Sequence, residues 1–436
     1  MERKPACSSG ANPGARGGKR AGRTEYMEKD LTSGSVLKNI FTFSLPYLLS
    51  YFLQTLYGMA DLFIIGRSVG AGDKKQAAKV IGNTVTLFMV GSVVLAAALV
   101  GLVDPIVRLI STPEEAVAGT TAYLTICFIG IPCITAYNVL ASIFRGMGDS
   151  RSPMYFIAAA CVVNIGLDFF FMGALRLGPA GAALGTTLSQ AVSVLLALCV
   201  ILKHKSIRLS KSDFCPRKAT MKDILSIGLP VAAQDGFIQV SFMLITVMAN
   251  QRGLTDAAAV GIVEKIISFL FLVPSSMLST VSALGAQNIG AGKYDRVDDI
   301  LRYAIAIGVG FGAVMALLMQ FIAPSVVRPF TSDEAVVLAG AAYIRSYIFD
   351  CLFAGIQFSF SGYFCAWGRS GLSFLHNTLS ILLVRVPGAW LACRFFPQTL
   401  VPMGLAPACG SLFSSIVCIL LYRWMKRQNK PTGNKD

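Results

Sequence analysis

Eleven apolar runs, each long enough to cross a lipid bilayer, account for most of this 436-residue sequence. A helix needs about 20 apolar residues to span the hydrocarbon core, and its backbone polar groups must be satisfied within the segment. Only 14% of the residues are charged, against about a quarter in soluble domains. The sequence therefore predicts an all-α polytopic membrane protein of about 11 spans. The runs cover residues 36–66, 80–110, 121–144, 154–174, 180–202, 221–250, 257–286, 301–327, 338–366, 371–396 and 402–424.

The formal net charge of +15 comes from a few basic tails and loops between these runs. This distribution is typical of cytoplasmic segments under the positive-inside rule, so we expect no nucleic-acid partner. Residues 1–30 are expected to form a disordered basic tail, 203–220 a cytoplasmic linker and 425–436 a cytoplasmic tail. Met27 opens a more regular segment, so residues 1–26 are expected to be an extension that packs against nothing.

Cysteine and histidine usage excludes several kinds of site. The eleven cysteines include no CxxC pair, and most lie within apolar runs, where they are expected to pack as small apolar residues. The two histidines, His204 and His376, are too few for a metal cluster or a Ser/His/Asp hydrolase. We therefore predict neither an enzyme nor a metal or organic cofactor.

An internal repeat relates the two halves of the chain. Pro46 and Pro230, each in a Leu-Pro pair that opens a run, lie 184 positions apart. Later landmarks lie 220 positions apart, among them the glycines of VGAGDK and IGAGK at Gly70 and Gly290. The difference of 36 residues predicts one six-helix unit in two copies, of which the first lacks a helix.

The predicted N-terminal bundle thus covers residues 31–202 with one helix missing near 67–69, and the C-terminal bundle covers 221–424. Charge placement supports the gap, because the lysines of residues 74–79 lie one crossing from the basic N-terminal tail. Seven extended residues reach at most about 25 Å, less than a bilayer about 30 Å thick. We expect either an inverted or displaced first span, or an extended, unpaired stretch around 66–72.

The glycine-rich turns at 70–74 and 290–293, the segment RGMGDSRSP at 145–153 and the segment EKIISFLFLVPSSMLSTVSALGAQNIGAGK resemble the multidrug and toxic compound extrusion (MATE) family. The resemblance covers about residues 27–424. It implies two six-helix bundles related by an axis along the membrane normal. It also implies export of organic cations, and some neutral compounds, in exchange for H+ or Na+. The missing helix departs from the family pattern.

Carboxylates inside the apolar runs indicate a site, because a charge at mid-bilayer costs about 2.5–3.5 kcal/mol or more. Asp61 lies in the first run, and Asn164 and Asp168 lie one helical turn apart in a later run. The repeat-related positions are apolar or glycine, namely Ile245, Val384 and Gly388. Because the scaffold is duplicated and these polar residues are not, we expect one cation site in the N-terminal bundle.

The resemblance implies the same location. Family members bind the coupling cation on an aspartate of the first helix, an Asn-x-x-x-Asp pair of the fifth and a threonine of the sixth. These correspond to Asp61, Asn164, Asp168 and Thr186. Other interpretations remain open: an interfacial residue for Asp61, a buried polar contact between helices for the pair, and simple helix packing for Thr186.

A possible substrate path is predicted from further polar residues. The family's fourth-helix asparagine falls near Asn138. Charged residues in the apolar runs of the C-terminal bundle could form internal ion pairs or line the drug path; they are Asp235, Glu264, Asp350 and Arg385.

We expect a cation-coupled antiporter that exports organic cations or drugs by alternating access. Asp61 or Asp168 would hold a proton, or Asp168 would coordinate sodium with Asn164. Its partners would be small organic cations and the bilayer, and the protein would be a monomer in a prokaryotic plasma membrane. The alternatives are a lipid-linked saccharide flippase, which would carry a cluster of cavity cations that this sequence lacks, and a truncated relative without transport activity.

Overall fold

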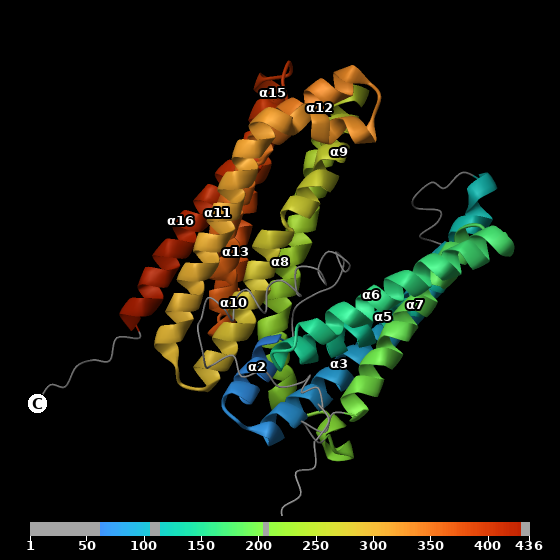
Figure 1. Ribbon diagram of the computed structural model, residues 1–436, viewed down its shortest axis with the longest axis vertical. Helices are drawn as coiled ribbons and strands as arrows, with labels where there is room; N and C mark the ends of the chain where they lie inside the picture. The colour runs from blue at the N-terminus through green and yellow to red at the C-terminus, as the bar shows by residue number, and fades with distance from the viewer. Residues whose placement is uncertain (1–61, 105–113, 204–208, 429–436) are drawn as a thin grey trace, which may run out of the picture.

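The computed structural model describes residues 62–104, 114–203 and 209–428, and all the regular secondary structure in these ranges is helical (Figure 1). Ten of its helical segments are long and apolar enough to cross a membrane. They coincide with the ten apolar runs after the first, so this part of the predicted architecture is confirmed. The run 36–66 lies largely outside the described residues.

The N-terminal bundle is a set of helices that pack on one another. They are α2 (Leu62–Gly70), α3 (Lys74–Gly101), α5 (Glu114–Gly146), α6 (Arg151–Asp168) with a π-helical extension η1 (Phe169–Ala174), and α7 (Pro179–Lys203). The linker that follows contains a short 3-10 helix, η2 (Lys211–Phe214).

The C-terminal bundle is a second set of helices that pack on one another. Its elements are α8 (Lys218–Asn250), α9 (Leu254–Leu270), α10 (Leu272–Gly290), α11 (Tyr294–Val327), η3 (Arg328–Phe330), α12 (Glu334–Tyr347), α13 (Phe349–Ala366), α14 (Ser370–Ser380), η4 (Ile381–Arg385), α15 (Val386–Phe395) and α16 (Val401–Gln428). Three spans are bent pairs, α9 with α10, α12 with α13, and α14 with α15, the last joined by the π-helix η4.

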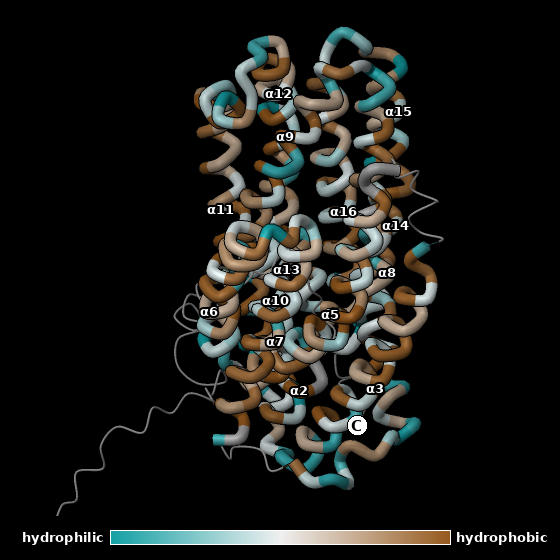
Figure 2. Tube along the Cα trace, turned by 90° about the vertical axis from the view of Figure 1, so that its right-hand side faces the viewer, coloured by the Kyte–Doolittle hydropathy of each residue, from teal (hydrophilic) through white to brown (hydrophobic). Residues whose placement is uncertain are grey.

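The two bundles meet at one end and diverge at the other, which gives the molecule a V shape (Figure 1). The end where they meet carries the α2–α3 turn, the α10–α11 turn, η2 and the end of α16, and we call it the basic end. Hydrophilic residues gather mainly at the two ends of the helices, and hydrophobic residues follow their lengths (Figure 2). This banding is the pattern of a polytopic membrane protein.

Backbone conformation confirms the repeat at an offset of 220. Gly72 and Gly292 both adopt the left-handed conformation, with φ of 71° and 73°, in the turns after α2 and α10. Gly148 and Gly368 do the same, with φ of 88° and 72°. Glycine is the residue that reaches this region without steric cost, so the sequence repeat is also a repeat of turns.

A contact between α2 and α10 joins the bundles at the basic end. A Cβ on Gly70 would lie 2.1 Å from the carbonyl oxygen of Gln287, and a Cβ on Gly290 would lie 2.2 Å from that of Arg67. The two contacts are related by the repeat, because Gly70 and Gly290 lie 220 positions apart and so do Arg67 and Gln287. The Gln287 side chain also donates to the Gly146 carbonyl at 3.1 Å.

The expectation of an extended, unpaired stretch at 66–72 is wrong. Residues 66–70 continue α2, and the Asp73 side chain, which accepts from the Gln76 backbone N–H at 2.9 Å, caps the start of α3. The expectation assumed that this segment crosses the whole bilayer, whereas it turns at Gly72 within the basic end. A displaced first span remains a prediction, since residues 1–61 lie outside the described part. The missing helix also remains a prediction: α2 is continuous through residues 67–69, and the chain before it is not described.

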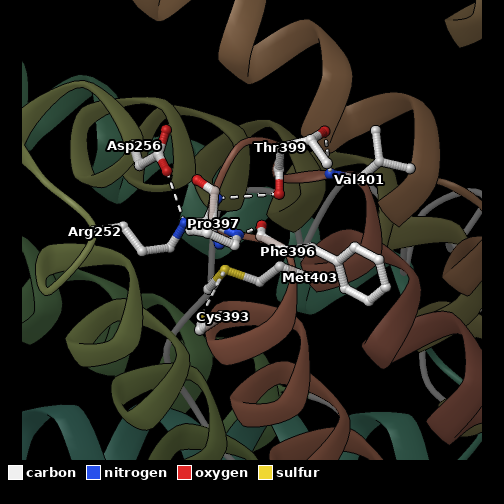
Figure 3. Close-up of polar contacts among 8 residues, drawn as sticks. All are labelled: Arg252, Asp256, Cys393, Phe396, Pro397, Thr399, Val401 and Met403. Carbon is white, nitrogen blue, oxygen red and sulfur yellow. Dashed lines mark hydrogen bonds and ion pairs between the residues drawn. The ribbon is translucent and has the colours of Figure 1, made fainter.

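An arginine braces the opposite end of the C-terminal bundle (Figure 3). The Arg252 side chain is 7% exposed and pairs with Asp256 at 2.7 Å. It also donates to the backbone carbonyls of Phe396, Pro397 and Thr399 at 3.0–3.2 Å. One guanidinium thereby ties the α8–α9 turn to the loop between α15 and α16, using the fork of donors that only arginine has.

Candidate cation site and substrate path

Asn164 and Asp168 meet on the last turn of α6, as their spacing predicts. The Asn164 Nδ2 donates to the Asp168 Oδ1 at 3.5 Å, and both side chains are half-buried. A donor–acceptor distance this long is a weak hydrogen bond. The carboxylate and the amide oxygen are both hard oxygen ligands of the kind that bind small cations.

Both side chains point at α7. A Cβ on Gly185 would lie 2.2 Å from the Asp168 Oδ1 and 3.4 Å from the Asn164 Nδ2. The absence of a side chain at Gly185 therefore makes the room that the carboxylate occupies between α6 and α7. These two helices belong to the same bundle and pack along their lengths.

The helix changes type directly after Asp168. Residues Phe169–Ala174 form the π-helix η1, and π-helical segments occur frequently at functional sites. The related helix of the other bundle contains η4, a second π-helix, which ends at Arg385. Neither segment was predicted, because one-residue insertions into a helix leave no distinct apolar pattern.

The remaining residues assigned to the cation site stay predictions. Thr186 is exposed on α7, and its hydroxyl donates to the Ala182 carbonyl of its own helix at 3.0 Å. Its neighbour Thr187 packs against Gly130 of α5. Asn138 is half-buried on α5. Asp61 lies outside the described residues.

In the C-terminal bundle, Glu264 of α9 lies beside α8. The Thr246 hydroxyl is 3.3 and 3.2 Å from its two carboxylate oxygens and also 3.0 Å from the Phe242 carbonyl. Glu264 is half-buried, and it interacts electrostatically with Arg385. The sequence did not predict the role of Thr246, because only the packing of α8 on α9 brings it to the carboxylate.

Arg385 is the centre of this cluster. Its side chain donates to the Tyr347 hydroxyl at 2.8 Å and lies over the Phe242 ring, 4.6 Å from the ring centroid. It also interacts electrostatically with Asp350 and Glu264. The arginine is 9% exposed, so two carboxylates, an aromatic face and a phenol surround one buried cation.

Asp350 is the most buried carboxylate of the cluster. It is fully buried in the first turn of α13. Among the described residues, neither of its oxygens has a partner in hydrogen-bond geometry, although Ser411 lies near it. A buried carboxylate without such a partner is costly unless it is protonated or holds a cation.

Asp235 is more exposed to solvent than the residues of this cluster. It lies on α8, two helical turns before Phe242, and it is exposed. The structure therefore brings together three of the four charged residues singled out in this half, Glu264, Asp350 and Arg385. Arg385 interacts electrostatically with both carboxylates, whereas Asp235 is an exposed carboxylate on α8.

The chain matches a known family and several curated proteins. The MatE family model matches residues 41–170 and 230–391, more than half of the chain. The "Probable multidrug resistance protein YpnP" of Bacillus subtilis (strain 168) is 29% identical over 437 aligned positions, which cover 91% of this chain and 96% of that protein. The "Multidrug export protein MepA" of Staphylococcus haemolyticus (strain JCSC1435) is 23% identical, with coverages of 77% and 82%.

A solved structure has the same fold. It is an outward-facing conformation of a multidrug resistance MATE family transporter, and it superposes with a TM-score of 0.85. The sequences are 21% identical, and the alignment covers 92% of this chain and 98% of that one. The family match extends across both bundles, and the helical architecture agrees with it. The chain therefore belongs to the MatE family, whose members are membrane transporters and not enzymes.

Proposed function

We propose that this chain is a drug exporter of the plasma membrane that exchanges organic cations for H+ or Na+ by alternating access. Two relatives carry names that state multidrug resistance or export. The observation that carries the coupling proposal is the Asn164–Asp168 pair, lodged against Gly185 inside one bundle and absent from the other at the repeat-related positions. A duplicated scaffold with one unduplicated acidic site suits a single coupling cation.

In this proposal the coupling ion and the drug act on different bundles. A proton or sodium ion on Asp168 neutralises the N-terminal site and shifts the equilibrium between its conformations. The organic cation binds between the bundles, and the exposed carboxylate of Asp235 on α8 is a candidate for its opposite charge. The Glu264, Asp350 and Arg385 cluster then acts as the internal support of the C-terminal bundle.

The V shape fits one of the two states of alternating access. The basic end is closed by the α2–α10 contact and carries the basic residues of η2 and of the last turn of α16, so the positive-inside rule assigns it to the cytoplasm. The divergent end then faces outward. Export requires the reverse arrangement in the other half of the cycle, with the basic end open.

Efflux of ethidium from cells that express the chain tests this function. We expect Asp168→Asn to keep normal amounts of membrane protein and to lower efflux at least tenfold. The amide carries no negative charge, so it can neither take up a proton nor attract a sodium ion as the carboxylate does. Asp104→Asn, an exposed carboxylate near the end of α3, is the matched control and should leave efflux unchanged. Equal efflux from Asp168→Asn and the unsubstituted chain would refute the assignment.

The helix predicted to be missing from the N-terminal bundle calls for a second experiment. We add a helix patterned on residues 251–286 to the chain near residues 67–69. This extended version should enter the membrane more efficiently and export more dye than the unmodified chain. If the extended version also fails to export any organic cation, while it inserts normally, the drug-export proposal is wrong. Full export by the unmodified chain would refute the predicted need for the helix.

A further inference from the structure

The linker between the bundles is fastened to the N-terminal bundle. Residues 209–217, which we call the linker clamp, include η2 and end at Arg217, the N-cap of α8. The clamp packs against the basic end of α3. It therefore connects α3, a helix of the N-terminal bundle, to the first turn of the C-terminal bundle.

One fully buried asparagine, Asn83, holds the clamp at two points, its middle and its last residue. The Asn83 Nδ2 donates to the Asp213 carbonyl at 3.1 Å and to the Lys79 carbonyl at 2.9 Å. Its Oδ1 accepts from the Arg217 backbone N–H at 2.7 Å. Both the donor and the acceptor side of the amide are used, so Asn83 is specific for this backbone arrangement.

Two neighbours on α3 complete the docking surface. The Thr86 hydroxyl donates to the Phe214 carbonyl at 2.8 Å. A Cβ on Gly82 would lie 2.3 Å from the Asp213 carbonyl oxygen, so the clamp lies directly on the helix backbone at this glycine. Within the clamp, Ser210 and Asp213 form a reciprocal capping box that preorganises η2.

The repeat shows that this surface is a specialisation of one bundle. At the offset of 220, the three docking positions Gly82, Asn83 and Thr86 have counterparts on α11, and these are Arg302, Tyr303 and Ala306. All three counterparts are exposed in the described part of the chain. The scaffold of the helix therefore does not require a segment docked at this position.

We propose that the linker clamp is a conformational device that holds the two bundles together at the basic end and must leave Asn83 before this end can open. The clamp and the α2–α10 contact lie at the same end, and both join the two bundles. The α2–α10 contact is made by backbone against glycine, whereas the clamp adds directional hydrogen bonds, which are lost together when the clamp lifts away. This proposal rests on alternating access.

Two variants release the clamp by different physical means. Asn83→Ala removes the three hydrogen bonds of the amide, and Gly82→Ala places a methyl group against the Asp213 carbonyl. In each, hydrogen exchange at the Arg217 amide should accelerate at least tenfold. Asn83→Ala removes the acceptor of that N–H, and Gly82→Ala pushes the clamp away from it. Tyr303→Ala, at the repeat-related position of α11, is the matched control and should leave this exchange unchanged.

Opening of the basic end is measured as the distance between two spin labels, attached at the repeat-related positions Lys75→Cys and Asp295→Cys. The full chain is used, with its other exposed cysteines replaced by serine. Releasing the clamp should add a population at longer distance, and the Tyr303→Ala control should not. Release without any change in the distance distribution would overturn the proposal, as would unchanged exchange at Arg217 in both variants. The distance readout needs no transport. Absence of efflux from the unsubstituted chain, together with the predicted distance change in the variants, would therefore count against the proposed function alone.

Discussion

The α-carbon of Gly70 lies so close to Gln287 that a Cβ there would come within 2.1 Å of the Gln287 carbonyl oxygen. Because the clash would be with backbone, a side chain at this position cannot relieve it by rotation, and α2 and α10 would have to separate. The reciprocal clash of Gly290 with Arg67 makes the contact two-fold. The closed basic end therefore depends on two glycines that the sequence repeat already pairs.

Gly70→Ala and Gly290→Ala should each destabilise the protein by about 1–3 kcal/mol, the usual cost of overpacking a close contact. Thermal unfolding of the purified protein measures this loss. Gly91→Ala is the matched control, because nothing lies within 4 Å of a Cβ at that glycine of α3. It should be neutral or gain about 0.5–1 kcal/mol from helix propensity. A stable Gly70→Ala protein would contradict the two-fold contact.

Gly185→Ala should alter cation binding with little effect on stability. Its methyl group would meet the Asp168 carboxylate, the end of a side chain that can rotate away, at 2.2 Å. We expect a change in unfolding free energy below about 1 kcal/mol, together with loss of the stabilisation that Na+ or protons give the unsubstituted protein. Gly166→Ala, with no atom within 4 Å, should retain that stabilisation. If Na+ or protons stabilise the unsubstituted protein, Gly185→Ala and Gly166→Ala to the same extent, the cation site at Asp168 is wrong.

The Arg252 brace should contribute more to stability than an ordinary surface ion pair. Arg252→Ala leaves Asp256 and three backbone carbonyls without their donor, and we expect a loss of about 1–3 kcal/mol. Arg302→Ala is the control, because its pair with Asp299 is 3.8 Å long and its side chain is 77% exposed. Its loss should stay within about 0.5 kcal/mol. Similar melting temperatures for the two variants would show that the brace is dispensable.

Asp149, in the loop between α5 and α6, predicts a pH dependence of stability. Burial raises the pKa of its carboxyl above the ordinary value, although hydrogen bonds from Ser152 and Arg151 and the charge of Arg151 oppose the shift. The unfolded chain ionises at the lower pKa. The stability contributed by the neutral carboxyl is therefore complete below that value and is lost as the pH rises through the folded pKa.

Thermal unfolding of the unsubstituted protein and of Asp149→Asn between about pH 4 and pH 7 tests this. The unsubstituted protein should lose stability relative to Asp149→Asn as the pH rises. Asp149→Ala should be less stable than Asp149→Asn at every pH, by about 1 kcal/mol, because it lacks the oxygen that caps the first turn of α6. Parallel curves for the unsubstituted protein and Asp149→Asn would contradict the shift.

The sequence predicted those features of the fold that lie within one segment or recur in both halves of the chain. The apolar runs predicted about 11 spans because each is long enough to cross a bilayer, and ten of them are confirmed in the described part of the chain. The paired glycines at Gly70 and Gly290 predicted the matching turns. The contact between Asn164 and Asp168 followed from their helical spacing alone. Each of these signals lies within one segment or between two copies of it.

Contacts between unlike segments were not predictable in the same way. The room for Asp168 depends on Gly185 of another helix, and the setting of Glu264 depends on Thr246. The fastening of the linker depends on Asn83, which lies 130 positions from its partner Asp213. No periodicity connects such residues, since helix packing alone brings them together.

The most direct test of the account is efflux driven by an imposed ion gradient in proteoliposomes. Ethidium is loaded into vesicles that hold the purified chain with the predicted helix inserted, and an inward-directed gradient of Na+ or H+ is applied across the membrane. We expect one of the two gradients to drive ethidium across the membrane, and we expect Asp168→Asn to abolish this effect while the protein remains folded. Gradient-driven transport by Asp168→Asn at the rate of the unsubstituted protein would contradict the account.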